Sequence, residues 1–430
     1  MRGALIAACL LFILPCAASS LDWHVDTLDN GLKVMILENH QVPQVALSTT
    51  VQAGAKNETD YFDGATHFLE HLILFRGTEK MTGDEVAAAM KAHGAYFNGF
   101  TGSDWTDFVI SLPSENLDFA LQIHSDMLFR SNFPTEEMDK ERQAVIEEIN
   151  ITEDDPWRKA YRTSLKVLFE GHPYSKNVLG TKENIRTIPR DSIYAYYKRY
   201  YAPNNMTTVI VGDVDPDQAL ALVKKYFGDI PRGTTPQDMY HEPPQRNKVE
   251  QLTIKRDIGQ AYLMMTSIGP KADSKDQYAL DLAATVLGSG ESSRLWKKLK
   301  DELGLVYSIN YSFYTSKYEG TLLTFAVVDP DKVGPVENAI NDVLNEVKRD
   351  GFTERELRKA KNIIKTGHFA GMQRLFDIAD KYAQYSSFIN YQFVEDYPGN
   401  IENVSLAEMN EVARKYFNTD SYVKTTVVPR

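Results

Sequence analysis

An internal near-repeat constrains the fold of this chain more than any other feature. The triplet Arg199-Tyr200-Tyr201 precedes one strand-like segment, and Lys415-Tyr416-Phe417 precedes another at an offset of 216 in the numbering. Thr135-Glu136 opens one helical segment, and Thr353-Glu354 opens another at an offset of 218. Matches this short also arise by chance, but two matches at nearly one spacing favour a duplicated α+β half of about 210 residues.

Strand-like and helical segments alternate through both parts of the chain, which is compatible with a duplication. In the first part we expect strands at 32–38, 44–52, 105–112 and 206–211, and helices at 61–75, 83–93, 115–129, 135–151, 157–169, 191–201 and from 215 onward. In the second part we expect strands at 249–255, 260–266, 305–313, 320–327 and 422–428, and helices at 277–287, 293–303, 333–348, 353–387 and 406–416.

A proline-rich stretch separates the two parts. Residues 233–248 (GTTPQDMYHEPPQRNK) contain three prolines and no apolar periodicity, which is typical of a linker. We therefore predict an N-terminal domain at 21–232, a linker at 233–248 and a C-terminal domain at 249–430.

The first twenty residues are typical of a secretory signal peptide. Arg2 is followed by an apolar run at 4–14 and by small residues at 17–20. A buried N-terminal strand or helix is the alternative interpretation. Both cysteines lie in this segment, so the mature protein would have neither a disulfide nor a thiol nucleophile. We expect an exported protein, periplasmic or secreted, without a transmembrane segment after cleavage, because no other apolar run approaches about 18 residues.

The charge of the chain argues against one class of partner. The 430 residues include 47 Lys and Arg against 59 Asp and Glu, a formal net charge of −12. Nucleic-acid binding needs concentrated basic residues that displace counterions, so we expect no nucleic-acid partner.

The sharpest local motif is His67-Phe68-Leu69-Glu70-His71. Residues four apart lie one turn apart on one helix face, so the imidazoles of His67 and His71 can close on one metal ion. Glu70 lies beside that face, where it can reach a metal-bound water. His-x-x-Glu-His is the zinc-binding order of the inverzincins. The alternative is an ordinary helix that carries these residues by accident.

A third zinc ligand is expected on another element, because catalytic zinc usually has three protein ligands. Glu141 and Glu148 are seven residues apart in the helical segment 135–151, so both carboxylates face the same way. Seven-spaced glutamates are also common on surface helices, and the spacing alone does not choose a ligand.

The segment 64–78 (GATHFLEHLILFRGT) resembles the zinc helix of the pitrilysin, insulin-degrading enzyme and mitochondrial processing peptidase family. The resemblance extends over the mature chain, and the last two of its further segments look like those of small bacterial members. These segments are NGFT at 98–101, GHPY at 171–174, LGT at 179–181, YYAPNNM at 200–206, SSRL at 292–295 and GLVYS at 304–308.

The resemblance implies roles for the two glutamates. Glu148 follows His71 at the family spacing of the third ligand, so His67, His71 and Glu148 would bind one Zn²⁺ per chain. Glu141 would be an accessory glutamate that supports His71 or the zinc-bound water. Glu70 would take a proton from that water and return it to the leaving amine.

The resemblance also implies an α+β fold with two homologous α/β-sandwich halves, each a mainly antiparallel sheet with helices on one face. Two such chains would close like a clamshell around a chamber, as a homodimer or as a heterodimer with a related subunit. The offset of 216 places the counterparts of the motif in an apolar helix, so we expect no metal site in the second half. These counterparts are Ala283, Val286 and Leu287.

Two further pairs of residues receive roles from the resemblance. The family has an Arg and a Tyr seven apart that stabilise the tetrahedral intermediate; Tyr307 matches the Tyr, and Lys300 stands at the Arg position. Lys keeps the positive charge but lacks the planar guanidinium that can bind two oxygens at once, so it stays open whether Lys300 can hold the substrate as the Arg does. Asn98 and Gly99 resemble the edge strand that binds substrate backbone, a form of strand addition. The alternatives are a solvated lysine, a core tyrosine and an ordinary turn.

These observations together predict an exported zinc metalloendopeptidase that cuts short or unfolded peptides inside a dimeric chamber. One alternative is a zinc subunit that is active only with a separate partner carrying the Arg and Tyr, an alternative that Lys300 motivates. The other is a non-catalytic assembly or chaperone-like member of the same family.

Overall fold

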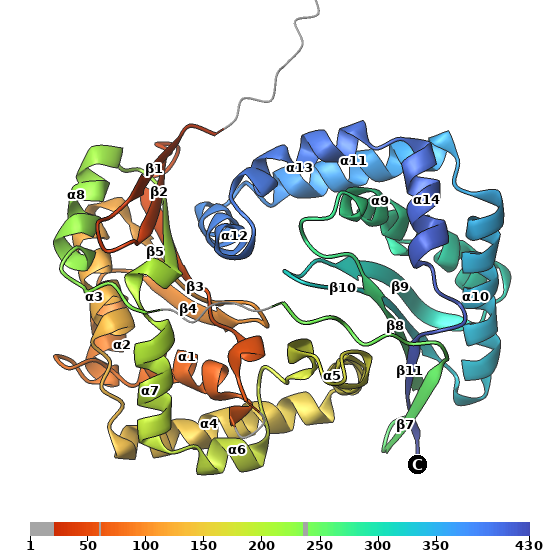
Figure 1. Cartoon of the computed structure of the whole chain (residues 1–430), viewed down its shortest axis with the longest axis horizontal. Helices are drawn as coiled ribbons and strands as arrows, with labels where there is room; N and C mark the ends of the chain where they lie inside the picture. The colour runs from red at the N-terminus through yellow and green to blue at the C-terminus, as the bar shows by residue number, and fades with distance from the viewer. Residues whose placement is uncertain (1–20, 60–61, 235–239) are drawn as a thin grey trace, which may run out of the picture.

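The computed structural model describes residues 21–59, 62–234 and 240–430. The predicted signal peptide at 1–20 lies outside these residues, as does part of the predicted linker. Figure 1 shows two sheets, each with helices from its own part of the chain. Among the described residues, no helix combines the length and the apolar character needed to cross a bilayer.

The first sheet has six strands in the order β1-β2-β6-β3-β5-β4. β2 and β6 run parallel, and the other neighbours run antiparallel. β4 is therefore an outermost strand. The strands are β1 (Trp23–Thr27), β2 (Lys33–Glu38), β3 (Gln44–Val51), β4 (Tyr96–Thr101), β5 (Thr106–Pro113) and β6 (Met206–Gly212). The helices of this half are α1 (Ala65–Phe75), α2 (Gly83–Ala92), α3 (Leu117–Phe129), α4 (Thr135–Asp154), α5 (Pro156–Leu168), α6 (Lys182–Thr187), α7 (Arg190–Tyr200) and α8 (Pro216–Phe227).

The second sheet has five strands in the order β7-β11-β8-β10-β9, with β7 and β11 parallel and the other neighbours antiparallel. This order repeats β2-β6-β3-β5-β4 of the first sheet, so the predicted duplication and fold class are confirmed. The strands are β7 (Glu250–Arg256), β8 (Ala261–Gly269), β9 (Val306–Tyr314), β10 (Gly320–Val328) and β11 (Val423–Pro429). The helices are α9 (Asp276–Gly288), α10 (Val333–Asp350), α11 (Glu354–Ala370), α12 (Leu375–Phe388), α13 (Gln392–Asn403) and α14 (Leu406–Tyr416).

Each half places one helix on the sheet of the other half. α5 packs against β8 and β11, and α12 packs against β3 and β6. In Figure 1, α12 lies beside the N-terminal sheet although it belongs to the second part of the sequence. Both contacts are apolar: Ala160 is buried with Met264, Leu323 and Val427, and Ile378, Ala379, Tyr382 and Ala383 are buried with Met35, Leu37, Ala46, Val209 and Val211. The two halves are thus tied together, and the predicted domain division stays a prediction.

Several elements differ from the sequence prediction. The segment 353–387 is not one helix, because Arg374 is extended (φ −100°, ψ 134°) between α11 and α12. The break lets α11 pack against α9 of its own half while α12 reaches the first sheet. The predicted helix at 293–303 is a shorter π-helical segment, η6 (Trp296–Glu302). β1, α6 and α13 were not predicted; α13 contains Pro398, which ordinarily disfavours a helix.

Candidate metal centre

The N-terminus of α1 is set by a close contact between two glycines. The helix begins four residues later than predicted, because Gly64 has a left-handed conformation with φ 90°. A Cβ at Gly64 would lie 2.6 Å from the Cα of Gly180, so the approach requires glycine. The carboxylate of Glu58 accepts hydrogen bonds from the backbone N–H groups of Gly64 and Thr66, each at 2.7 Å. These bonds satisfy two free donors at the helix start and fix the helix that carries the metal motif.

The three predicted metal ligands converge in the structure. His67 and His71 project from α1, and Glu148 projects from α4, which packs against it. The Nε2 atoms of His67 and His71 each lie 3.4 Å from Oε2 of Glu148. The ligand atoms of these three residues, which we call the metal cluster, all lie within 4.8 Å of one another. The structure therefore brings together two helical segments that are far apart in the sequence.

Glu141 contacts Nδ1 of His71, whereas Glu148 faces Nε2 of the same ring. Nδ1 of His71 donates a hydrogen bond to Oε1 of Glu141 at 2.7 Å. Arg76 binds the other carboxylate oxygen of Glu141 and also contacts Glu137 at 3.3 Å. A carboxylate on the second nitrogen of a metal-binding histidine fixes its tautomer and ring orientation. Glu141 is only 2% exposed, so its carboxylate contacts His71 and Arg76 rather than solvent.

Glu70 is buried beside the cluster, on the side of strand β4. Its Oε2 accepts a hydrogen bond of 2.6 Å from the hydroxyl of Thr101. A Cβ at Gly99 would lie 2.8 Å from Oε1 of Glu70, so the glycine leaves the space that this carboxyl occupies. Burial raises the pKa of Glu70 to about 7, more than the hydrogen bond from Thr101 lowers it. The carboxyl is therefore held at a fixed place between α1 and β4.

The donor set fits a zinc ion. Two imidazoles and one carboxylate are the ligands of many catalytic zinc sites, which leave a further position for water. Burial lowers the pKa of His67 to about 4, so this imidazole is neutral and has a lone pair for a cation. The hydrogen bond to His71 lowers the pKa of Glu148, so this carboxyl is ionised. Burial acts to lower the pKa of His71, but the bonds to Glu141 and Glu148 outweigh it and raise the pKa to about 9; a bound cation would displace that proton.

The predicted substrate-binding residues lie on an edge strand, as expected. Asn98 and Gly99 are in β4, whose one sheet partner is β5. The amide of Asn98 donates to the hydroxyl of Tyr96 at 3.2 Å. An ordinary turn at this place is therefore excluded, while a role in binding peptide stays a prediction.

Lys300 and Tyr307 lie in the other half of the chain. Lys300 is in η6, and its Nζ donates to the backbone carbonyl of Tyr307 at 3.1 Å. Tyr307 lies at the start of the edge strand β9, is 48% exposed, and donates its hydroxyl to Asp329 at 2.7 Å. Within the described residues, no hydrogen bond, ion pair or ring contact joins either side chain to the metal cluster. The structure therefore does not bring them to the site within one chain.

Two residues of the site received no role from the sequence. Thr101 orients Glu70, and Arg76 holds Glu141. Thr101 is two residues beyond Gly99 in a strand, so strict alternation could have placed it on the same face. Arg76 follows the last turn of α1, and no local pattern distinguishes it from a solvated arginine.

Two family models match the chain one after the other. The model described as Insulinase (Peptidase family M16) matches residues 33–182, a range that includes His67, Glu70, His71 and Glu148. The model described as Peptidase M16 inactive domain matches residues 187–364. The chain belongs to the M16 peptidase family. The resemblance stated from the sequence is thereby confirmed, and all the metal-site residues of this M16 chain fall within the first of the two matches.

Relatives in several bacteria share most of the length of this M16 chain. An "uncharacterized zinc protease" of Mycobacterium leprae is 29% identical over 395 residues, which cover 91% of this chain and 88% of the relative. One from Mycobacterium tuberculosis H37Rv is 30% identical over 394 residues, with 90% and 89% covered. The protein YmxG of Bacillus subtilis, with the same description, is 27% identical over 405 residues, with 94% and 97% covered.

Solved structures share the M16 fold. A protease from Helicobacter pylori has a TM-score of 0.90 at 24% identity, covering 96% of this chain and 100% of the other. A structure described as the peptidase M16 inactive domain from Pseudomonas fluorescens has a TM-score of 0.88 at 20% identity, covering 95% of this chain and 98% of the other. These likenesses establish the two-halved fold.

Proposed function

We propose that this M16 chain is an exported, zinc-dependent endopeptidase that hydrolyses extended peptides. The observation that carries the proposal is the convergence of His67, His71 and Glu148 next to the buried carboxyl of Glu70. The relatives described as zinc proteases support the same assignment.

The chain's own residues would supply proton transfer. Zinc, when bound by the three ligands, lowers the pKa of water toward about 7 and polarises the scissile carbonyl. Glu70 would take the proton and deliver it to the leaving amine. Oε2 of Glu70 accepts the hydrogen bond from Thr101, and no hydrogen bond to Oε1 is found among the described residues. Oε1 would therefore be the oxygen that takes the proton. Glu141 is a positioning residue, because it acts on His71 and not on substrate.

The edge strand β4 supports extended peptides as substrates. An outermost strand has a row of backbone N–H and C=O groups that are free to pair with another chain. Gly99 lies in this strand directly against Glu70, so a peptide paired with β4 would pass close to the catalytic carboxyl. A folded protein offers no free strand of this kind, which favours short or unfolded substrates.

Export and assembly are part of the proposal. The signal-peptide features of residues 1–20 support export. The periplasmic protease PqqL of Escherichia coli, whose first half shares this fold with a TM-score of 0.76 at 22% identity, is compatible with that location. Because Lys300 and Tyr307 do not reach the metal cluster within one chain, we propose a dimer in which this pair serves the site of a partner.

A zinc subunit that needs a different partner is the second candidate. The observation that favours it is that Lys300 and Tyr307 already have partners in their own half, the Tyr307 carbonyl and Asp329. Such a subunit would bind zinc but would not cleave peptides without its partner.

Metal analysis combined with peptide hydrolysis tests the proposal. We expect the purified mature chain to contain one zinc per chain and to cleave a quenched-fluorescence peptide library, to lose cleavage on chelation, and to regain it when zinc is restored. Stoichiometric zinc without cleavage would favour the partner-dependent subunit. Cleavage that persists after complete removal of zinc would contradict both candidates.

A further inference from the structure

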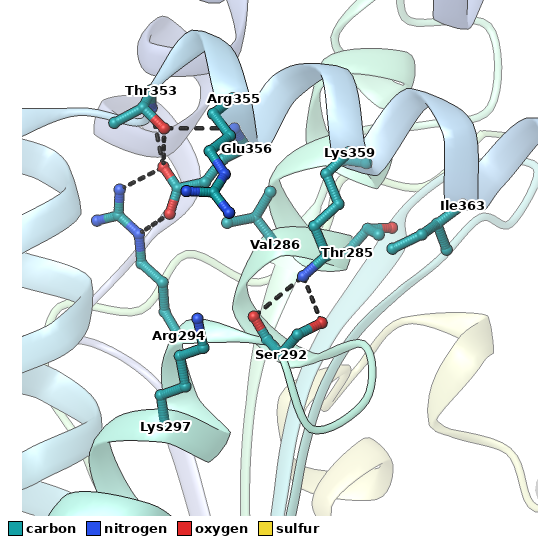
Figure 2. A pocket seen from close by; sticks show the side chains of 11 residues that line it. Thr285, Val286, Ser292, Arg294, Lys297, Thr353, Arg355, Glu356, Lys359 and Ile363 are labelled. Atoms are coloured by element: carbon teal, nitrogen blue, oxygen red, sulfur yellow. Dashed lines mark hydrogen bonds and ion pairs between the residues drawn. The ribbon is translucent and has the colours of Figure 1, made fainter.

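A cavity of about 630 Å³ lies in the C-terminal half, away from the metal cluster. Its walls come from α9, from the segment before η6 and the start of η6, and from the first turns of α11 (Figure 2). Val286, Ala360 and Ile363 form an apolar part of the wall, and half of the other eight lining residues are basic. The basic side chains are Arg294, Lys297, Arg355 and Lys359.

This cavity is the counterpart of the metal cluster. The metal cluster lies between α1 and α4, and the cavity lies between α9 and α11, the elements at the same places in the repeated fold. The offset of 218 between the two helix starts, Thr135 and Thr353, extends to the linings. It relates His67, Arg76, Glu137 and Glu141 to Thr285, Arg294, Arg355 and Lys359, all four of which line the cavity.

The charges of the two sites are opposite. Glu137 and Glu141 lie beside the metal cluster, and the corresponding residues of the cavity are Arg355 and Lys359. Glu356 is the one carboxylate of the described lining, and Arg294 occupies it with two hydrogen bonds of 2.7 and 2.8 Å. Figure 2 shows this pair together with Thr353, whose hydroxyl also donates to Glu356 at 2.9 Å. The negative charge of Glu356 is therefore paired with Arg294 and forms no ion pair with the other three basic side chains of the lining.

The remaining cations have little or no compensation. Lys359 donates to the backbone carbonyl of Ser292 at 3.0 Å, which leaves its charge unpaired. In the described part of the chain, the exposed side chains of Lys297 and Arg355 have no hydrogen bond or ion pair. A second cavity of about 590 Å³ shares Arg355 and Lys359 and adds Arg358, which likewise has no such partner there. This concentration of unpaired positive charge stands in a chain whose net charge is −12.

We propose that this cavity binds an organic oxyanion with two or more phosphate or carboxylate groups. Arginine forks and lysine ammonium groups are the usual partners of such groups, and their hydrogen bonds to an anion are stronger than neutral ones. The volume lies within the range of small-molecule sites, which is roughly 300 to 1,000 Å³. The apolar wall at Val286 and Ile363 would contact the carbon skeleton of the ligand. The proposal does not depend on zinc chemistry in the other half.

Calorimetric titration of the zinc-loaded protein tests this site, with pyrophosphate in one arm and tricarballylate in the other. Both probes can also chelate Zn²⁺, so only binding that the cavity variant loses is assigned to the cavity. We expect saturable binding of at least one probe, with affinity that falls as sodium chloride is raised. In Lys297→Gln/Arg355→Gln the affinity should fall about 100-fold, roughly tenfold for each lost charged contact. Both side chains are exposed and unpaired, so their removal leaves no buried group unsatisfied.

The control is Lys33→Gln/Lys91→Gln, which removes the same charge from exposed positions in the N-terminal half. It should bind the probes as the wild type does. Binding of pyrophosphate alone would identify a phosphate ligand, and binding of tricarballylate alone a carboxylate ligand. The absence of saturable binding in both arms, or an equal loss in both double variants, would overturn the proposal.

Discussion

Two sites of this molecule lie between equivalent pairs of helices and carry opposite charges. The site between α1 and α4 has two imidazoles and a set of carboxylates, whereas the cavity between α9 and α11 is lined by arginines and lysines. The strand order behind them is the same, and an arginine after the first helix binds a glutamate of the second helix in both, Arg76 with Glu141 and Arg294 with Glu356. The duplicated backbone thus provides a similar position between two helices in each half, and a few side chains determine whether that position favours a cation or an anion.

The helix and the edge strand also meet differently in the two halves. In the first half the glycine that permits the close contact is on the strand: Gly99 of β4 leaves space for Glu70 of α1. In the second half the glycine is on the helix: a Cβ at Gly288 of α9 would collide with the backbone nitrogen of Tyr311 in β9. The offset of 218 makes Gly288 the counterpart of Glu70, in place of Val286, which the offset of 216 predicts. The place that Glu70 occupies in the first half is therefore closed by backbone in the second half.

The largest expected effect is that of Glu70→Gln. The amide keeps the size of the side chain and the acceptor for Thr101 but does not accept a proton, so peptide cleavage should fall by about 10² to 10⁴-fold. The three ligands are untouched, so zinc content should remain one per chain. Steady-state hydrolysis together with metal analysis measures both. Turnover at the wild-type rate would remove Glu70 from its assigned role.

The two glycines provide a direct test of the helix–strand comparison. Gly288→Ala should lower the free energy of unfolding by about 3 kcal/mol or more, because the new Cβ meets backbone that does not yield. Gly99→Ala meets the ends of the Glu70 and Leu74 side chains, which can move, so its cost should be smaller. Urea denaturation gives the two values. Gly99→Ala should instead reduce cleavage, because it displaces Glu70; equal stability losses with full activity would contradict this difference.

A smaller effect is expected for Glu141→Gln. The change replaces the charged acceptor of the hydrogen bonds from His71 and Arg76 by a neutral amide. Loss of a carboxylate that holds a metal-binding histidine typically lowers metal affinity or activity about 10 to 100-fold. Zinc affinity from competition with a chelating dye measures it. The matched control is Lys359→Gln, at the equivalent position of the second half, which should leave zinc affinity and cleavage unchanged. A loss in the control as large as that in Glu141→Gln would show that the metal cluster and the cavity are not independent.

Much of the fold and of the metal site was predictable from the sequence. The spacing of His67 and His71 is local, so one helix is enough to place both imidazoles on one face. Glu148 is distant, and spacing alone left it equivalent to any surface glutamate; the family resemblance selected it. The strand order could be expected once the halves were recognised as duplicates.

The remaining features depend on contacts that have no local signal. An amphipathic helix must cover some sheet, but its sequence does not state which one, so the exchange of α5 and α12 between the halves was not predictable. The break before α12 follows from the same exchange. The cations Arg355 and Lys359 have the pattern of a solvated helix face, and only the packing of α11 against α9 places them around a cavity.

The smallest expected effect concerns the two exchanged helices, which meet their sheets with different polar groups. α12 places Asp380 against Asp107 of β5, which also accepts from Ser48 and Thr50 of β3 at 2.7 and 2.6 Å. α5 instead places Ser164 against Thr425 at 2.7 Å. Burial raises the pKa of both aspartates, and for Asp107 the charge of Asp380 adds to the rise. The folded state therefore binds more protons than the unfolded state above the ordinary pKa of Asp, so this contact loses stability as the pH rises.

Asp107→Asn should remove part of that loss. Between about pH 5 and pH 8 the wild type should lose more stability than the variant, because its raised pKa at Asp107 keeps a proton in the folded state that the unfolded state has already released. The matched variant Ser164→Ala breaks the corresponding contact of α5 and has no group that titrates there, so its stability should change with pH as the wild type does. Urea denaturation of the three proteins at both pH values measures the difference. If Asp107→Asn and the wild type show the same pH dependence, the pair is not protonated in the folded state, and the two exchanged helices are electrostatically alike.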